Sequence, residues 1–533
     1  MPDFISLNHS SNDPIYKMKR ISVSTLLTGF TLCSSLLLHP ASLSSQHLAK
    51  PVRATWINFE YQDERNKYMN PFGTDMTNPE LWKTKMSELN EFGIKYVILM
   101  YVANNGRSFY NSNFMPHAYK DGIPSPVDVI MKSADELGMK VFMSSGWAKD
   151  QDDNPALPEI RSVQLKIMKE TADLYSKHKS FYGWYLPCED VVGPFLSERA
   201  VNAANELASE ARKLTPGAKV MISPYGLRMA KFDDGRFAEQ IAKLKVDIIA
   251  YQDEIGCVVE DMPIPHLKEN FMKLREVHDK AGIAFWSNNE AFTWEKGLNT
   301  RPSALIPAPF PRYLSQICGA SAAKVDEVSS FAICGIFDKP GSAFPIGEPE
   351  LSRTAWKDYM DWLSGKGRWS ILEATFLNLL SNEAKGMTVT FTGRESASTG
   401  AGLLTDGKFG VESTSDKNWV INEKGDLIFV VDMKKEVDIS SVATRFLTCR
   451  KHSVAFPSTV EFSFSADGQN FTSPVTVRMD NYLPDRYDCW IDLAYSGPIT
   501  IRSRYIRVYC INSAGMKIMC DEVIVNPSTR EKQ

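Results

Sequence analysis

Two glutamates stand at the ends of strand-like segments, and their position predicts acid–base chemistry. Glu189 closes the apolar run that begins at Phe181, and Glu290 closes the run that begins at Ile283. Cleavage of a glycosidic bond uses two carboxyl groups on opposite sides of that bond, one as a nucleophile and one as a proton donor. We therefore take Glu189 and Glu290 as the candidate catalytic pair.

The pair depends on the elements that would position it. Eight short apolar segments, each followed by a helix-like stretch, predict a (β/α)₈ barrel of parallel strands buried on both faces. By count, Glu189 ends strand four and Glu290 ends strand seven, on opposite sides of the mouth where such barrels carry their chemistry. The predicted strands are 52–59, 96–102, 140–147, 181–189, 219–225, 246–254, 283–290 and 331–338.

Other polar and aromatic side chains fall near the same predicted strand ends. Sugar rings stack on flat aromatic faces while their hydroxyls meet carboxylates and amides, although packing explains each single aromatic equally well. Asp253 or Glu254 could replace a member of the pair, Glu60 could form a structural ion pair, and Glu189 could cap a helix or pair with Arg199. The candidate substrate-binding residues are Glu60, Tyr101, Trp147, Tyr225, Tyr251, Asp253, Glu254, Trp286 and Asn289.

Length and charge limit the class of protein. A chain of 533 residues is too long for one ordinary core, and its net charge of −4 argues against binding of nucleic acid. From Ser370 onward, alternating strands separated by glycine, asparagine and aspartate turns predict an antiparallel β-sandwich. We expect an N-terminal segment over 1–50, the barrel over 51–367 and an all-β sandwich over 371–528.

The N-terminal segment has the pattern of an export signal. Lys17, Lys19 and Arg20 precede an apolar run over 23–38, and small residues follow it. The residues before Cys33 form a poor lipid-attachment box, so we expect a periplasmic or extracellular protein without a lipid anchor. No other stretch is apolar enough to span a membrane in the mature protein.

The cysteines lack the paired spacing of a zinc site, so no zinc is expected. Export permits disulfides among the four cysteines of the last domain, but their pairing stays open. These residues are Cys449, Cys489, Cys510 and Cys520.

Three motifs carry a resemblance over 53–362, namely Gly183–Glu189, Tyr251–Gly256 and Trp286–Glu290. This segment resembles a bacterial family of secreted TIM-barrel proteins of unknown function, and its arrangement is similar to that of clan A glycoside hydrolases. The resemblance implies that Glu189 is the acid/base and Glu290 the nucleophile, with Tyr251 where the clan often places a tyrosine that bonds the nucleophile. The clan usually has asparagine before the acid/base, whereas Cys188 stands here.

The last domain resembles the discoidin, or factor five/eight type C, fold. The motifs that carry this are Leu404–Gly407, Leu427–Asp432, Val460–Gly468, Tyr505–Val508 and Asp521–Val523. The resemblance implies a carbohydrate-binding module with one structural calcium ion held by Asp406 and Glu522, although Asp406 could equally only shape its turn. The candidate sugar platforms are Trp419, Tyr482, Tyr487 and Trp490, of which the two tryptophans could instead be core.

The sequence therefore predicts an exported glycoside hydrolase that acts on an oligo- or polysaccharide by a retaining mechanism and needs no cofactor for catalysis. The alternative is a non-catalytic glycan-binding barrel, which Cys188 favours slightly. A metal-dependent deacetylase would need His/Asp clusters, and with eight histidines in the chain none is apparent.

Overall fold

A computed structural model describes residues 47–60, 76–150, 153–187, 189–256, 264–296, 303–365, 367–392, 400–479 and 489–529. All of them belong to one compact unit that spans Ser45–Gln533. The predicted export signal, Cys33, Cys188, Tyr482 and Tyr487 lie outside the described residues.

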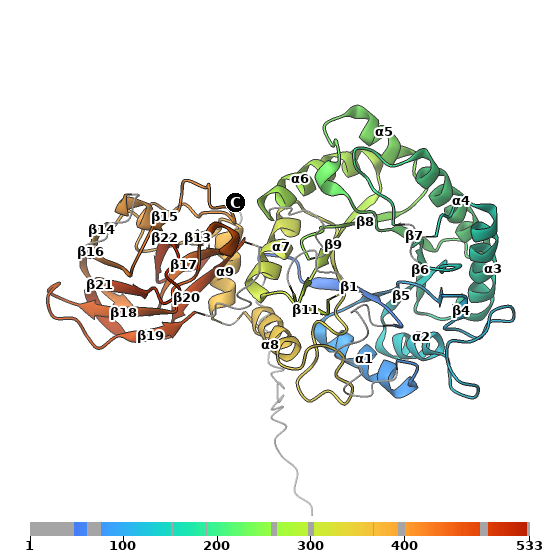
Figure 1. The fold of residues 1–533 in the computed structure, drawn as a ribbon, viewed down its shortest axis with the longest axis horizontal. Coiled ribbons are helices and arrows are strands. Elements are labelled where there is room, and N and C mark those ends of the chain that lie inside the picture. The colour runs from blue at the N-terminus through green and yellow to red at the C-terminus, as the bar shows by residue number, and fades with distance from the viewer. Residues whose placement is uncertain are drawn as a thin grey trace, which may run out of the picture. The chain divides into compact units, whose positions relative to one another are not determined.

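Eight parallel strands close into a barrel, which confirms the predicted fold (Figure 1). Around the ring the order is β1-β12-β9-β8-β7-β6-β5-β2, so neighbours in space are neighbours in sequence among the barrel strands. The strands are β1 (Val52–Ile57), β2 (Tyr96–Leu99), β5 (Lys140–Ser144), β6 (Phe181–Tyr185), β7 (Lys219–Ile222), β8 (Ile248–Gln252), β9 (Ala284–Glu290) and β12 (Glu327–Phe331).

Strand eight lies earlier in the chain than predicted. The structure places it at Glu327–Phe331, and residues 332–338 form turns beyond its end. Its two serines hide it from an apolar pattern, because both are fully buried with satisfied hydroxyls. Ser330 Oγ donates to the Asn289 carbonyl at 2.8 Å, and Ser329 Oγ donates to the Ser287 carbonyl.

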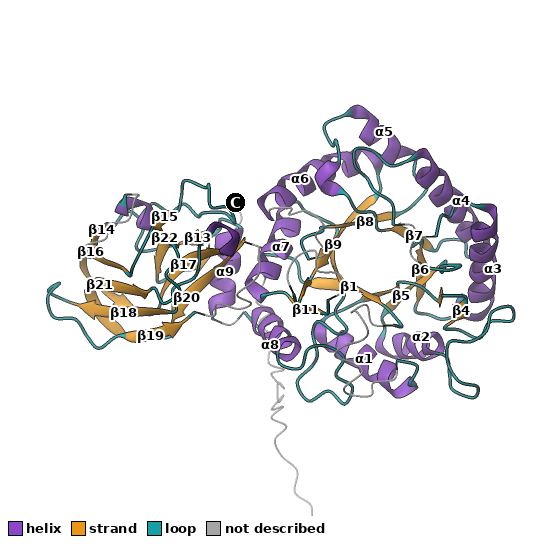
Figure 2. Cartoon of the chain, viewed as in Figure 1, coloured by secondary structure: helices purple, strands orange, loops and turns teal. Residues whose placement is uncertain are grey.

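Helices surround the ring of strands (Figure 2). Glycine ends the first two helices, with φ of 107° at Gly93 and 66° at Gly138, a left-handed conformation that other residues rarely adopt. Asn78 and Ser125 cap their N-termini. The helices are α1 (Pro79–Phe92), α2 (Pro126–Leu137), α3 (Pro158–Tyr175), α4 (Glu198–Leu214), α5 (Gly235–Lys243), α6 (Ile264–Ala281), α7 (Phe310–Ala322), α8 (Leu351–Leu363) and α9 (Arg368–Phe376).

Short elements decorate the carboxyl ends of the barrel strands. Two small hairpins, β3 (Ala103–Asn104) with β4 (Arg107–Ser108) and β10 (Phe292–Trp294) with β11 (Leu305–Pro307), follow strands two and seven. A single 3₁₀ turn, η3 (Leu227–Met229), follows strand five. These elements build the surroundings of the two glutamates.

Antiparallel sheets follow the barrel, as the fold class predicted. The five-stranded sheet runs β14 (Thr388–Phe391), β16 (Leu427–Ile439), β21 (Ile501–Ile511), β18 (Thr459–Ser465) and β19 (Val475–Arg478). The four-stranded sheet runs β15 (Val420–Asn422), β22 (Ile518–Val525), β17 (Val442–Cys449) and β20 (Cys489–Ser496), and β13 (Leu380–Ser381) pairs with β23 (Ser528–Thr529).

A disulfide joins Cys449 to Cys489, which face each other on neighbouring strands β17 and β20. Cys510 and Cys520 are buried free thiols.

Helices α7 and α9 contact strand β20 of the four-stranded sheet. Ser315 Oγ on α7 donates to the buried carboxyl group of Glu412, and Arg368 on α9 pairs with Asp492 at 3.0 Å. One hydrophobic cluster contains barrel residues together with Trp419, Leu447 and Leu493. Barrel helices and sheet therefore share part of their core.

Candidate functional site

Aromatic rings fill the barrel interior below its mouth. Trp286 of β9 lies against Tyr96 of β2 with ring centroids 5.0 Å apart, and against Phe142 of β5 at 6.0 Å. Trp56 of β1 meets Tyr185 of β6 from across the ring at 6.0 Å. Trp286, predicted to bind substrate, is thus a packed interior residue four positions before Glu290.

Glu290 is the last residue of β9 and is 4% exposed. Its Oε2 accepts a hydrogen bond of 2.7 Å from the backbone N–H of Gly256, in the loop after β8. A Cβ at position 256 would lie 2.4 Å from the Phe292 carbonyl and 3.2 Å from Oε2, so only glycine fits this close approach. The loop after strand six therefore fixes the carboxylate of strand seven.

A buried polar network supports the strand that carries Glu290. Asp253, which is fully buried, accepts hydrogen bonds from Asn289 Nδ2 at 2.8 Å and from Gln316 Nε2 at 2.6 Å. Asp253 also accepts the backbone N–H of Glu290 at 3.1 Å. Burial raises the pKa of the Asp253 carboxyl, while these donors act in the opposite direction. Asp253 thus connects Asn289 to Gln316 of α7 and positions Glu290 through its backbone.

Arg312 ties the same loops together from α7. Its guanidinium is fully buried and donates to the carbonyls of Ile255 at 3.0 Å, Glu290 at 3.2 Å and Phe292 at 2.7 Å. Sequence reasoning missed Arg312 and Gln316. Two polar residues spaced i, i+4 in an otherwise apolar helix were the available signal.

Glu189 lies four residues beyond the end of β6 and is half-buried. The Pro187 carbonyl accepts the Trp147 indole N–H at 3.2 Å, which holds the chain just before it. The Asp190 carbonyl accepts the Tyr225 N–H at 3.2 Å, which holds the chain just after it. Two of the predicted substrate residues, Trp147 and Tyr225, therefore position the backbone around Glu189.

Glu60 and Tyr101 form a second polar group near the ends of strands one and two. Glu60 accepts hydrogen bonds from Asn104 at 2.9 Å and pairs with Arg107 at 3.3 Å. Its backbone N–H donates to the Tyr101 hydroxyl at 3.0 Å, and the Tyr101 ring stacks on Trp147 at 4.8 Å. Burial raises the pKa of Tyr101. The ion pair left open for Glu60 is present.

Tyr251 and Glu254 are engaged away from Glu290. The Tyr251 hydroxyl lies 3.0 Å from His278 Nε2 on α6, so this ring faces the helix layer and not the barrel interior. The contact expected between Tyr251 and Glu290 is therefore not made, because Tyr251 and the interior-facing residues of β8 alternate in direction. Glu254 Oε2 accepts the N–H groups of Gly226 at 2.8 Å and Leu227 at 2.9 Å and caps η3.

The candidate calcium residues of the last domain lie together. Burial raises the pKa of Glu522 to about 8, and the neighbouring carboxyl groups of Asp521 and Asp406 act in the same direction. Glu522 also accepts hydrogen bonds from the Gly407 N–H and, at 3.1 Å, from Asn382 Nδ2. Two adjacent carboxyl groups fit a cation, but among the described residues no group of three or more His, Cys, Asp or Glu could hold a metal.

The two tryptophans proposed as sugar platforms are core residues. Trp419 is 1% exposed and lies against Gly410, where a Cβ would come within 2.4 Å of the indole. Trp490 is 3% exposed and meets Phe456 at 6.0 Å. Neither ring presents a face to solvent.

Fold and site together define a (β/α)₈ barrel with carboxylates at the ends of strands four and seven. The chain belongs to the family described as a domain of unknown function (DUF4434), whose match covers residues 56–344. No curated protein matches the sequence. Within the described residues, no helix is long and apolar enough to cross a membrane.

The similar solved structures include glycoside hydrolases. A putative alpha-L-fucosidase from Bacteroides thetaiotaomicron is 18% identical, with 64% of this chain and 99% of that chain covered and a TM-score of 0.47. A glycoside hydrolase family 5 protein from Bacteroides vulgatus is 12% identical, with 87% and 89% covered and a TM-score of 0.36. A chitosan-binding module from Paenibacillus sp. IK-5 is 16% identical, with 27% and 96% covered and a TM-score of 0.20. At these values the likenesses carry no argument about the reaction.

Proposed function

We propose that this protein is an exported glycoside hydrolase in which Glu290 is the nucleophile and Glu189 the acid/base. The observation that carries the proposal is Glu290 itself, a buried carboxylate at the end of strand seven that one loop, one helix and an adjacent buried carboxyl group position. Carboxylates at the carboxyl ends of barrel strands are where this fold does its chemistry.

The two environments suit different roles. Glu290 is almost wholly buried and bonded to a backbone N–H, as a nucleophile held in one geometry would be. Glu189 is half-buried on a segment held at both ends, where it can donate a proton to a leaving group and later accept one from water. A retaining mechanism requires the two carboxyl groups about 5–5.5 Å apart.

Export and an oligo- or polysaccharide substrate complete the proposal. The Cys449–Cys489 disulfide supports export, because structural disulfides persist mainly in oxidising compartments. We also propose a structural calcium ion at Asp406 and Glu522, where it would relieve repulsion between adjacent carboxylates.

The experiment is turnover of a glycan library by wild type and two variants. Glu290→Ala should abolish turnover, because no covalent intermediate forms, and added azide should restore cleavage with inverted stereochemistry. Glu189→Ala should slow substrates with poor leaving groups by about 10²–10⁴-fold while activated aryl glycosides are spared. Glu327→Gln, at the opposite end of strand eight, is the matched control and should keep wild-type rates.

Each other outcome has a definite meaning. Wild-type rates in both glutamate variants would refute the assignment and direct attention to Asp253, Glu254 or Glu60. Binding of glycans by wild type without turnover of any would replace the proposal with the non-catalytic glycan-binding barrel.

A further inference from the structure

A small apolar hollow lies between strands one and eight and the hairpin that follows strand seven. Its walls include Trp56, Phe292, Leu305, Phe331 and Ala332, together with isoleucine and methionine side chains. The volume of the hollow that a water-sized group can occupy is about 20 Å³, which is enough for one water molecule or one methyl group. Its lining favours the methyl group, because an apolar cavity gives water too few hydrogen-bond partners.

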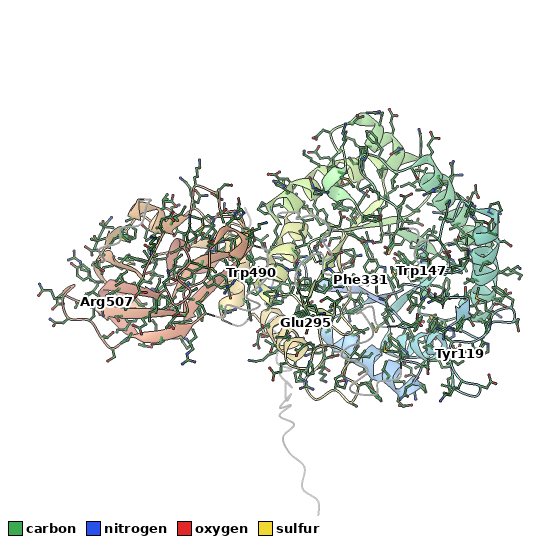
Figure 3. All side chains as sticks on the ribbon, in the orientation of Figure 1. Tyr119, Trp147, Glu295, Phe331, Trp490 and Arg507 are labelled. Carbon is green, nitrogen blue, oxygen red and sulfur yellow. A yellow bond between two sulfur atoms is a disulfide. The ribbon has the colours of Figure 1, made fainter. Side chains whose placement is uncertain are left out.

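The hollow is next to Glu290 along two strands. Phe331 is the register partner of Glu290 in the pairing of β12 with β9, and Phe292 lies two residues beyond Glu290. The N–H of Ala291 donates to the Phe331 carbonyl at 3.2 Å, which holds the two walls together. Figure 3 labels Phe331, which lies within the ring of barrel strands. Two lining residues, Phe331 and Phe292, therefore lie next to Glu290 along the backbone of paired strands at the carboxyl end of the barrel.

The side-chain amide of Asn58 interrupts the apolar lining, which also includes the Cys334 thiol. The side-chain oxygen of Asn58, one residue past the end of β1, is shielded from solvent and has no hydrogen-bond partner among the residues that the structure describes. A buried acceptor without a donor is destabilising, because it has lost its hydrogen bond to water and gained none in return. A ligand with an N–H or O–H group beside its methyl group would satisfy this oxygen.

We propose that the hollow is a specificity pocket for a methyl-bearing sugar, with the methyl group against Phe331 and Trp56 and an adjacent donor on Asn58. This pocket rests on one part of the proposed function, namely that the barrel mouth binds a sugar, and does not require that the sugar is hydrolysed. Two kinds of sugar carry this chemistry. In a 2-acetamido sugar the acetyl methyl is on the same amide group as an N–H donor. In a 6-deoxyhexose the methyl group is on C5, and the neighbouring carbon C4 bears a hydroxyl.

The test is calorimetric binding of monosaccharides, which bind whether or not the protein hydrolyses glycosides. N-acetyl-D-glucosamine is compared with D-glucose, and L-fucose with L-galactose. The methyl-bearing member of one pair should bind about 10-fold more tightly, because one extra group in an apolar pocket discriminates by roughly 10–200-fold. The pair that shows the preference identifies the source of the methyl group.

Substitutions in the hollow test whether it causes the preference for the methyl-bearing sugar. Ala332→Val narrows the hollow and should bring the preference down to about twofold or less, and Leu305→Phe is a second filling variant on a different element. Asn58→Leu should weaken binding of the preferred sugar about 10-fold, since it removes the acceptor. Ala355→Val, which lines another surface hollow on α8, is the matched control and should change nothing.

Equal binding within both pairs, or no binding of any of these sugars at millimolar concentration, would overturn the pocket. So would a preference that survives both filling variants. Methyl-selective binding together with failure to cleave any glycoside would leave the pocket standing and refute hydrolysis alone.

Discussion

Replacement of Lys85 by methionine should destabilise the barrel strongly, although Lys85 is far from the candidate site in sequence. Lys85 Nζ lies 2.9 Å from Asp338 Oδ1 and 2.9 Å from Glu88 Oε2, and the three side chains are 2%, 1% and 9% exposed. Burial alone would lower the pKa of Lys85, but the carboxylates of Asp338 and Glu88 outweigh it and raise the pKa to about 12. The ammonium group therefore stabilises two buried carboxylates.

The size of the effect follows from what the substitution leaves behind. Loss of one partner from a buried ion pair costs about 3–5 kcal/mol, because the other charge stays buried. Asp338 keeps backbone donors from Ile346 at 2.8 Å and Gly347 at 2.7 Å, so we expect the lower end, about 3 kcal/mol.

Urea unfolding of wild type and variants measures this free energy. Lys83→Met is the matched control, because Lys83 is on the same helix and its pair with Glu80 is 57% and 62% exposed. Exposed pairs contribute about 0–1 kcal/mol. Since the folded pKa of Lys85 lies above its ordinary 10.5, the stabilisation should be complete below pH 10.5 and decline as the pH rises through 12. If Lys85→Met cost no more than Lys83→Met, the argument from burial would be refuted.

Three further predictions concern other ionisable groups. Asp253→Asn should lower kcat with little change in KM, because it disturbs the hydrogen bonds that Asp253 makes to Asn289 and to the backbone of Glu290. Steady-state kinetics measure both constants. An unchanged kcat would contradict a positioning role for Asp253. The pKa of Glu522 is raised to about 8 from 4.5, so its contribution to stability is complete below pH 4.5 and is lost as the pH rises through 8. In the presence of a chelator Glu522→Gln should therefore melt at higher temperature than wild type at pH 8, and added calcium should stabilise only wild type; a lower melting temperature for the chelated variant would contradict the shift. Burial lowers the pKa of His278 to about 4 from 6.5, so stability should fall as the pH drops from 6.5 to 4, and His278→Gln should flatten that part of the urea-midpoint profile.

The elements that predict well from sequence are those with local signals. Helices α1 and α2 begin at capping residues and end at glycine, and both signals can be read in the local sequence. The predicted bounds of strand eight lie too late in the chain, because Ser329 and Ser330 are buried polar residues whose hydrogen-bond partners lie on another strand. A pattern of apolar residues cannot represent a hydroxyl that is satisfied only by tertiary contact.

In the candidate site too, some features follow from the local sequence and others depend on tertiary contacts. Counting strands placed Glu290 at the end of strand seven, because strand order alone determines that position. The direction of a side chain near a strand end depends on one residue of register, so Tyr251 was assigned to the mouth although it faces His278. Arg312 and Gln316 come from the helix after the site, and only the folded chain brings them to Glu290.

Helix α7 has two working faces, and this limits how its sequence can vary. Arg312 and Gln316 hold the strand that ends at Glu290, while Ser315, between them in sequence, bonds Glu412 beyond the barrel. A substitution in α7 that preserves its contacts with the strand of Glu290 must also be compatible with its contact with Glu412. Among relatives we therefore expect Arg312 and Gln316 to persist wherever the glutamate of strand seven persists. We expect Ser315 and Glu412 to change together, and Ser315 to drift in relatives whose barrel carries no such sheet.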